Sequence, residues 1–428
     1  MGRAFTSLVI FFVIGGIASA PVRALLPAYV EGVVGATPKF TSVLFALQLA
    51  ASGTFAMVAG PLSDRFGRRA IVLLGIPAAV PGALIFATTE PLKLIPLAAL
   101  FGVMTGVQTS AGQGFLISSV DPARIGVATA TFFLASTFAG AIGAWAGGVL
   151  ADASGYPSVG LVGIALAVLA LVGAFVFLPE ANTAGEQPDS RVISGSGQQA
   201  RRRDGAASHS DAASVGFSAV LQAPGMWTIV GLRFWPTIAW GIATLAIPLY
   251  LYRLAGNATA PGTYALVSLG VASVGQLVTG RLVDVATRCR TGLPFELRRL
   301  VAAISVGLVV ASVAATLSTG SALALGAAGT AWTALAWALA TTMPPLMRGA
   351  SPDGFGRAIG LTEMAWSVAM LIGTTLAGLL ADLDPVVPFV VATGALVVSA
   401  VVAIRFVMGI DHGDAPHARE ARRDGDTG

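Results

Sequence analysis

The sequence predicts an all-α membrane protein whose twelve transmembrane helices form two parallel six-helix repeats. Three observations carry this prediction: scarce charge, a series of long apolar segments, and a repeat between the two halves. Only 11% of the 428 residues are charged and the mean hydropathy is +0.81, whereas soluble domains are roughly 25% charged. Twelve helices of about 20 apolar residues need roughly 240 residues. The composition excludes a soluble enzyme, a disordered chain and a nucleic-acid-binding protein.

Short polar or Gly/Pro-rich breaks separate the apolar segments and place the helices. The chain divides into an N-terminal repeat (1–180), a Gly/Ser/Arg-rich linker (181–222), a C-terminal repeat (223–408) and a charged tail (409–428). The twelve predicted spans are 5–30, 41–60, 70–88, 94–118, 126–150, 157–178, 226–252, 262–283, 299–317, 321–346, 356–381 and 386–408.

An ordered series of matches relates the two halves. Pro27 and Pro248 stand in similar tetrapeptides, LPAY and IPLY, at an offset of 221 (248 − 27). The segment that ends at Asp152 (GVLAD) matches the one that ends at Asp382 (GLLAD) at an offset of 230 (382 − 152). Matches in the same order over several spans indicate two parallel repeats joined by a linker.

The distribution of Arg and Lys predicts the orientation. Most basic residues fall in the segments that share one side with the N-terminus, and Lys39, Lys93 and Arg253 are the main exceptions. By the positive-inside rule, both termini and the linker are cytoplasmic. We therefore expect a multi-pass protein of the cell membrane, with the lipid bilayer as its surroundings.

Few residues are suited to metal or cofactor chemistry. The single cysteine, Cys289, excludes a cysteine cluster, and His209, His412 and His417 lie outside the apolar segments. No phosphate-binding loop of the GxxxxGK[ST] type occurs. We therefore expect no metal, no cofactor, no direct use of ATP and no enzymatic activity.

The loop between the second and third spans reads GPLSDRFGRR from Gly60 to Arg69. This segment resembles the signature loop of the major facilitator superfamily, G-x-L-[AS]-D-R-x-G-R-[RK]. With the internal repeat and the central linker, the resemblance extends over the chain except the linker and the tail. It implies a transporter of the twelve-helix fold, closest in style to drug and metabolite:proton antiporters.

The resemblance also implies a cytoplasmic gate. Asp64 would face the N-terminus of the eleventh span, where free N–H groups favour an anion, and Arg124 could pair with it. A second copy of the motif keeps Asp284 but loses the Gly-Arg pattern that follows. Alternatively, the arginines of the loop serve only to set the orientation. The expected gate residues are Gly60, Leu62, Asp64, Arg65, Gly67, Arg68, Arg69, Arg124 and Asp284.

Two patterns of proton antiporters are only partly met. The fifth span reads GAWAGG from Gly143 to Gly148, similar to the antiporter motif G-P-x-x-G-G with Ala144 in place of proline. The fourth span has no arginine ahead of Gly106, although drug:proton antiporters carry one there. Close helix packing explains the glycines equally well.

Charged residues inside the spans are candidates for function, because they are costly there. Arg23 shares a face of the first span with Phe12, Gly16 and Ser19, and it is a candidate for binding an anionic group. Its alternative role is to reach the outer lipid headgroups. Arg233, at the start of the seventh span, can reach the cytoplasmic surface with its long side chain.

Glu363 is the only carboxylate well inside a span, which makes it the candidate proton carrier. The competing interpretation is a structural ion pair with a neighbouring helix. Polar and aromatic side chains in other spans are candidates for substrate binding, although they also suit helix packing and interface belts. With Arg23, the substrate-binding candidates are Gln108, Gln113, Trp240, Trp337 and Trp366.

These features predict a monomeric secondary transporter that works by alternating access, with protons as the coupling ion. Its first expected activity is the export of a small amphipathic or anionic molecule. The alternatives are uptake by proton symport and a non-transporting membrane sensor built on the same fold.

Overall fold

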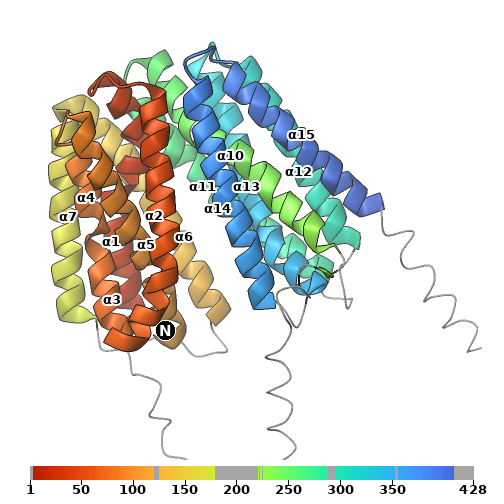
Figure 1. Cartoon of the computed structure of the whole chain (residues 1–428), viewed down its shortest axis with the longest axis horizontal. Coiled ribbons are helices and arrows are strands. Elements are labelled where there is room, and N and C mark those ends of the chain that lie inside the picture. The colour runs from red at the N-terminus through yellow and green to blue at the C-terminus, as the bar shows by residue number, and fades with distance from the viewer. Residues whose placement is uncertain are drawn as a thin grey trace, which may run out of the picture.

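The computed structural model describes residues 3–119, 125–178, 225–287, 295–351 and 355–408, together with 220, 222 and 223. Every regular element in these ranges is a helix (Figure 1). Eleven of the described helices are long and apolar enough to cross a membrane. The predicted all-α membrane fold is therefore confirmed.

The helices of the first half lie over the predicted spans and run a few residues further at most ends. They are α1 (Arg3–Gly32), α2 (Pro38–Phe66), α3 (Arg68–Gly75), η1 (Ile76–Ala78), α4 (Ala79–Ile85), α5 (Pro91–Ser119), α6 (Ile125–Ser154) and α7 (Tyr156–Phe177). Those of the second half are α10 (Met226–Ala255), α11 (Thr259–Thr287), α12 (Phe295–Leu317), α13 (Ala322–Ala350), α14 (Phe355–Leu380) and α15 (Val387–Met408).

The third predicted span is not one continuous helix. It consists of α3, the 3₁₀ turn η1 and α4, and Pro77 within η1 has ψ of 15°, outside the α-helical range. Pro77 and Pro81 each lack the N–H that would continue the α-helical hydrogen bonds. Proline therefore interrupts this span, whereas hydropathy alone shows a single apolar segment.

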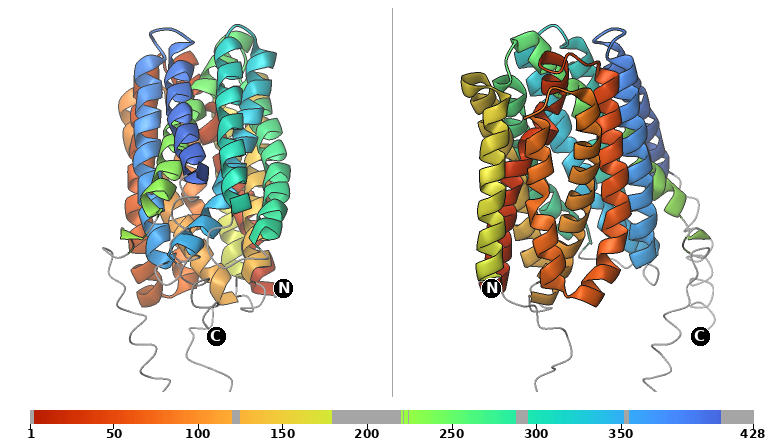
Figure 2. Two further views of the ribbon diagram at one scale, coloured as in Figure 1. Left: turned by 90° about the vertical axis from the view of Figure 1, so that its right-hand side faces the viewer. Right: turned by 60° about the vertical axis from the view of Figure 1, so that its left-hand side comes forward.

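The helices gather into two bundles with a gap that widens towards one end (Figures 1 and 2). In the first bundle α1 packs on α6 and α7, and in the second α10 packs on α14 and α15. The main contacts between the bundles are those of α6 with α11 and of α2 with α14, and α1 also touches α10 and α11. We call the end at which α1, α6, α10 and α14 finish the closed end, and the opposite end the open end.

The repeat found in the sequence has a counterpart in the contacts. The Tyr29 hydroxyl donates a hydrogen bond to the Thr88 carbonyl at 2.7 Å, and the Tyr250 hydroxyl donates one to the Ala381 carbonyl at 3.2 Å. Each tyrosine ends its LPAY or IPLY segment and ties the first helix of its half to a neighbouring chain segment. Both repeated tyrosines thus donate a hydrogen bond to a carbonyl at the closed end, although the two acceptors follow different helices of their halves.

Arginines near the open end form a second repeated contact. The Arg69 guanidinium donates a hydrogen bond to the Phe175 carbonyl at 2.7 Å and lies 5.9 Å from the Phe175 ring centroid. In the other half, the Arg298 guanidinium lies 5.1 Å from the ring centroid of Phe406. Cation–π contacts of this kind tie α3 to α7 and α12 to α15.

Glycines of α5 allow a close crossing with α2. A Cβ added at Gly102 would collide with the Gln48 carbonyl oxygen, and one added at Gly106 would collide with the Ser52 carbonyl oxygen. By contrast, no heavy atom lies within 4 Å of a Cβ added at Gly53. The absence of a side chain at Gly102 and Gly106 is therefore a packing requirement, as is typical of membrane helices.

We expect Gly106→Ala to destabilise the fold by about 1–3 kcal/mol, the usual cost of overpacking. The measurement is the thermal unfolding midpoint of the purified protein in detergent. Gly53→Ala is the matched control and should leave the midpoint unchanged or slightly higher, because alanine favours helix. A midpoint of Gly106→Ala equal to that of the control would contradict the proposed close crossing.

Candidate functional site

A doubly hydrogen-bonded ion pair joins the two halves at the closed end. Arg253, in the last turn of α10, donates from Nε to Glu31 Oε1 at 2.7 Å and from one terminal nitrogen to Oε2 at 2.6 Å. Glu31 lies at the end of α1, so the pair links the first helix of each half. Arg253 also donates to the Ala381 carbonyl at 3.3 Å. The planar guanidinium suits such two-point pairing with a carboxylate.

A second polar contact joins α6 to α11. Asp152, near the end of α6, accepts hydrogen bonds from the backbone N–H groups of Ala258 and Thr259, both at 2.7 Å, and one from the Thr259 hydroxyl. These N–H groups belong to the start of α11, where free donors and the helix dipole favour an anion. Asp152 therefore holds the N-terminus of a helix from the other half.

Small residues let the halves approach at this end. A Cβ added at Gly148 in α6 would lie 2.5 Å from the Ala258 carbonyl oxygen, and one added at Gly262 in α11 would lie 2.7 Å from that of Ala144. Gly147 packs in the same way against Pro21 of α1. The glycines of the antiporter-like segment thus serve close packing here, both within the first half and across the halves.

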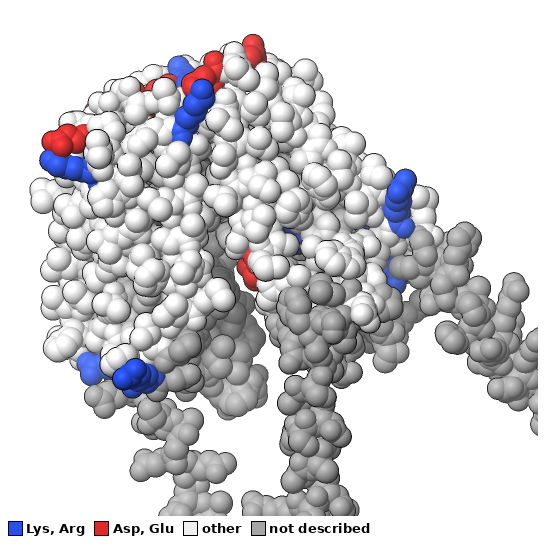
Figure 3. All heavy atoms as spheres, viewed as in Figure 1, with Lys and Arg blue, Asp and Glu red and all other residues white. Residues whose placement is uncertain are grey.

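The opposite end of the molecule is open. The space-filling view shows a cleft between the halves with acidic atoms on its wall, while most of the remaining surface at that level is uncharged (Figure 3). Helices α2 and α14 touch at the closed end, where Gly378 meets Pro38 and Ser42, and they diverge towards the open end (Figure 1). Along α2, Met57 is exposed at the level where the two helices have separated.

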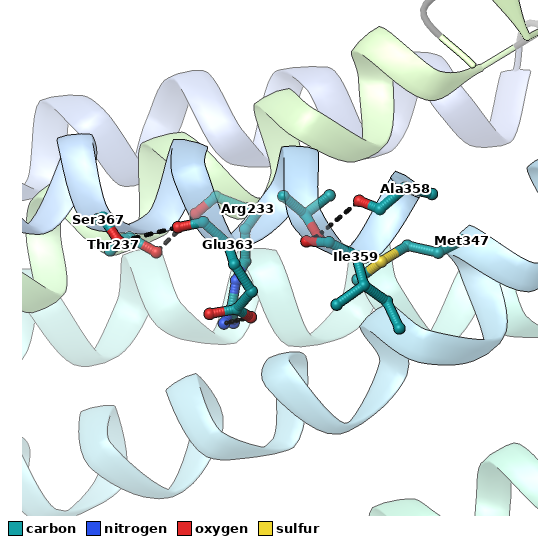
Figure 4. A network of polar contacts seen from close by, with 8 residues as sticks. Arg233, Thr237, Met347, Ala358, Ile359, Glu363 and Ser367 are labelled. Carbon is teal, nitrogen blue, oxygen red and sulfur yellow. Dashed lines mark hydrogen bonds and ion pairs between the residues drawn. The ribbon is translucent and has the colours of Figure 1, made fainter. Parts of the chain in front are cut away.

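An ion pair lies on the wall of this cleft (Figure 4). One terminal nitrogen of Arg233 in α10 lies 3.0 Å from Glu363 Oε1 in α14, and the Arg233 guanidinium lies 6.0 Å from the ring centroid of Trp366. The Glu363 side chain is 54% exposed, whereas that of Arg233 is 18% exposed. Glu363 is therefore paired and still open to water.

The position of Arg233 corrects the expectation that it reaches the cytoplasmic surface. It points instead to Glu363, and the carbonyl of its own residue accepts a hydrogen bond from Thr237 at 2.6 Å. The repeat offset of 221 could have indicated that Arg233 faces the interior. It matches Arg233 to Phe12 (233 − 12), which lies on the same face of α1 as Arg23. The sequence argument used that offset only for the tetrapeptides.

Glu363 of α14 and Met57 of α2 lie at the same distance from the crossing of the two helices. Helices α2 and α14 run antiparallel, and Gly378 contacts Ser42 at the closed end. Glu363 precedes Gly378 by fifteen residues and Met57 follows Ser42 by fifteen, so both lie about 22 Å from that crossing at 1.5 Å per residue.

The predicted polar and aromatic residues occupy different places. Trp240 and Trp366 are half-buried and lie on α10 and α14, the two helices that carry the ion pair. Gln108 faces α1, because its amide nitrogen would lie 3.4 Å from a Cβ at Gly15. Trp337 is half-buried with its indole nitrogen buried, and no hydrogen bond to that nitrogen is found in the described part of the chain.

Only part of the predicted gate motif can be located in detail. Leu62 is half-buried, Arg65 and Asp284 are exposed, and Gly67 has φ of 87° at the turn between α2 and α3. That backbone conformation favours glycine. Arg124 lies outside the described residues, as do the side chains of Gln113, Asp64 and Arg68 and the surroundings of Gly60.

A helical membrane fold with two bundles around a cleft that is closed at one end defines a transporter-type architecture. The sequence profile described as Major Facilitator Superfamily matches residues 5–347. The chain therefore belongs to the Major Facilitator Superfamily. No curated protein matches it.

Solved structures with the same fold include two crystal structures of a POT family transporter. One, in complex with a thioalcohol conjugated peptide, is 12% identical with a TM-score of 0.71 and covers 94% of this chain and 96% of its own. The other, in complex with 5-aminolevulinic acid, is 12% identical with a TM-score of 0.72 and covers 95% and 96%. At this identity the similarity concerns the fold.

We expect Glu31→Gln to loosen the closed end, because Arg253 loses its charged acceptor. A hydrogen bond to a charged group contributes about 1.5 kcal/mol at the low end, which corresponds to roughly tenfold faster opening. The measurement is amide hydrogen exchange at the ends of α1 and α10. The charge swap Glu31→Arg with Arg253→Glu should restore protection.

Glu90→Gln is the control for this experiment, since Glu90 pairs with Lys93 at 2.8 Å on the exposed surface. It should leave exchange at both helix ends as in the unaltered protein. Equal protection in Glu31→Gln and in the control would show that the Glu31–Arg253 pair does not hold the closed end.

Proposed function

We propose that this protein is a secondary active transporter that works by alternating access, with Glu363 as its proton carrier. One observation carries the proposal: Glu363 is exposed on the cleft wall at the level of the exposed Met57 of α2, so closure of the open end (the mouth of the cleft) would bring apolar surface towards it. An ionised carboxylate is costly in an apolar environment, so closing favours its protonated form. The conformational change and proton binding are thereby linked.

Arg233 supports the same role. While the mouth is open, its guanidinium lies 3.0 Å from the Glu363 carboxylate. Protonation removes the charge that Arg233 pairs with, and Arg233 then keeps its contact with the Trp366 ring. The carboxylate can thus exchange its proton without leaving an unpaired cation in a purely apolar site.

The first candidate activity is the export of a small amphipathic or anionic molecule in exchange for protons, from a cytoplasm on the side of the open end. The described charges on the cleft include Arg23, Arg233 and Glu363, which sum to one positive charge. Exchange of one monoanion outward for one proton inward moves two positive charges inward. The membrane potential therefore contributes about 4.6 kcal/mol per 100 mV to this exchange. An inside-negative membrane thus favours export.

Uptake by symport is the second candidate, and the presence of two cleft arginines favours it for an anion. Carrying one proton with one monoanion is electroneutral, so the membrane potential would not oppose it. The two similar structures were solved with a conjugated peptide and with 5-aminolevulinic acid, which supports a small organic molecule as the substrate. A non-transporting sensor would show neither activity.

We expect Glu363→Gln to abolish coupled proton movement while leaving substrate exchange intact, because the amide cannot carry a proton. The experiment uses proteoliposomes that contain a pH-sensitive dye and small organic ions first selected by thermal shift. A potassium diffusion potential separates the modes, since it should accelerate exchange with protons and leave electroneutral symport unchanged.

Glu90→Gln is the matched control, a surface carboxylate in an ion pair outside the cleft, and it should couple normally. Undiminished proton movement in Glu363→Gln would exclude Glu363 as the carrier. Absence of any flux in the unaltered protein, despite binding, would favour the sensor.

A further inference from the structure

Arg23 stands alone on a buried stretch of α1. From Ala18 to Val30 its side chain is the only exposed one, and Val22, Leu25 and Leu26 are completely buried. Helix α1 contacts helices of both halves, including α6, α7, α10 and α11. An exposed residue on such a central helix lines a space within the protein rather than the lipid surface.

The space around Arg23 opens towards the cleft. On the same face, Ala20, Leu26 and Pro27 are buried, whereas Ser19 and Gly16, further towards the open end, are half-buried. Arg23 precedes Gly32, the last residue of α1, by nine residues, which places it about 13 Å below the closed end. The Glu31–Arg253 pair covers that end, so the alternative that Arg23 reaches outer lipid headgroups does not fit.

Arg23 has no hydrogen-bond or ion-pair partner among the described residues. Most of the carboxylates described here are engaged elsewhere: Glu31 with Arg253, Asp152 with the start of α11, and Glu363 with Arg233. An unpaired cation at membrane depth is costly and marks a functional site by default. Arg23 therefore needs an anion to neutralise its charge.

The second half has residues at the matching level of α10, a helix that contacts α1. The offset of 221 matches Arg23 to Thr244 (244 − 23) and Ser19 to Trp240 (240 − 19) on α10. Trp240 and Thr244 are half-buried, and the Thr244 hydroxyl donates to the Trp240 carbonyl at 2.8 Å. The indole ring thus lies near the level of Arg23, on the helix that matches α1.

Arg23 and Arg233 cannot share one small ligand. Arg233 is matched to Phe12, which precedes Arg23 by eleven residues on α1, so the two arginines differ in depth by about 16 Å. Arg233 pairs with Glu363 nearer the mouth, whereas Arg23 lies at the bottom of the cleft. A ligand at Arg23 leaves the proton site unoccupied.

We propose that Arg23 is the anchor for the substrate and that the substrate is an organic monoanion with an apolar or aromatic body. A guanidinium binds carboxylates and sulfonates through paired hydrogen bonds, and a single cation balances one negative charge. Trp240 offers a surface on which the apolar body stacks. This inference rests on the proposed function, because the bound anion is a substrate only if the protein is a transporter. Binding of the anion can be tested without measuring transport.

The test measures binding of benzenesulfonate, benzoate, indole-3-acetate and octanoate to the purified full-length protein by thermal shift and calorimetry. Benzyltrimethylammonium and benzyl alcohol are the cationic and neutral probes of similar size. We expect at least one of the anions to bind, and neither of the other two probes. Failure of all four anions, or equal binding of the cation, would overturn the proposal.

Substitution of Arg23 tests whether the anion binds at this residue. We expect Arg23→Gln to weaken anion binding about tenfold or more, since it removes a charge-assisted pair, and Arg23→Lys to bind at an intermediate level. Arg405→Gln, an exposed arginine in the last turn of α15, is the control and should bind as the unaltered protein does. Unchanged anion binding in a folded Arg23→Gln variant would overturn the assignment of Arg23 as the anchor.

Two results separate this inference from the proposed function. Anion binding that depends on Arg23, without any proton-coupled flux, would support the site and refute the transporter. Proton-coupled flux of a cation that depends on Glu363, without anion binding, would support the transporter and refute the site. Size-exclusion profiles and unfolding midpoints of each variant show whether it is folded.

Discussion

An ionised carboxylate cannot be covered by apolar surface without a large cost, and in the proposed mechanism this constraint governs the mouth of the cleft. Glu363 is exposed and paired with Arg233, and Met57 of α2 is exposed at the same distance from the closed end. The open mouth suits the charged carboxylate, and a closed mouth suits the neutral acid. In this view a proton is a condition for closing, which is what coupling requires.

The closed end follows the opposite logic. Two of its carboxylates bind groups of the other half, Glu31 through Arg253 and Asp152 through the start of α11. These contacts hold the closed end while the two halves stay together, and they are lost if the halves rotate apart at this end. In the proposed mechanism the two ends therefore differ in kind: polar pairs between the halves hold one end, and the charge of Glu363 controls the other. Arg23 lies between them.

Much of the fold could be predicted from the sequence, because membrane helices are set by apolar length and the repeat is visible in LPAY and IPLY. The break at Pro77 could not be predicted from hydropathy, because hydropathy does not include the effect of proline on a helix. The importance of Glu363 followed from the rarity of charge inside spans. Its partner Arg233 did not, because pairing depends on how α10 and α14 pack, and this is a tertiary property. Arg253 and Asp152 were missed as gate residues for the same reason.

The most direct test of the central claim is the distance between spin labels at both ends of the cleft. After Cys289→Ser, one pair replaces Val33 and Leu383 at the closed end, and another replaces Phe66 and Val285 at the open end, all exposed positions. With Glu363→Gln, which mimics the neutral acid, the open-end distances should shorten while the closed-end distances lengthen. Distance distributions that are identical with and without Glu363→Gln would contradict the claim that the charge at Glu363 controls the mouth.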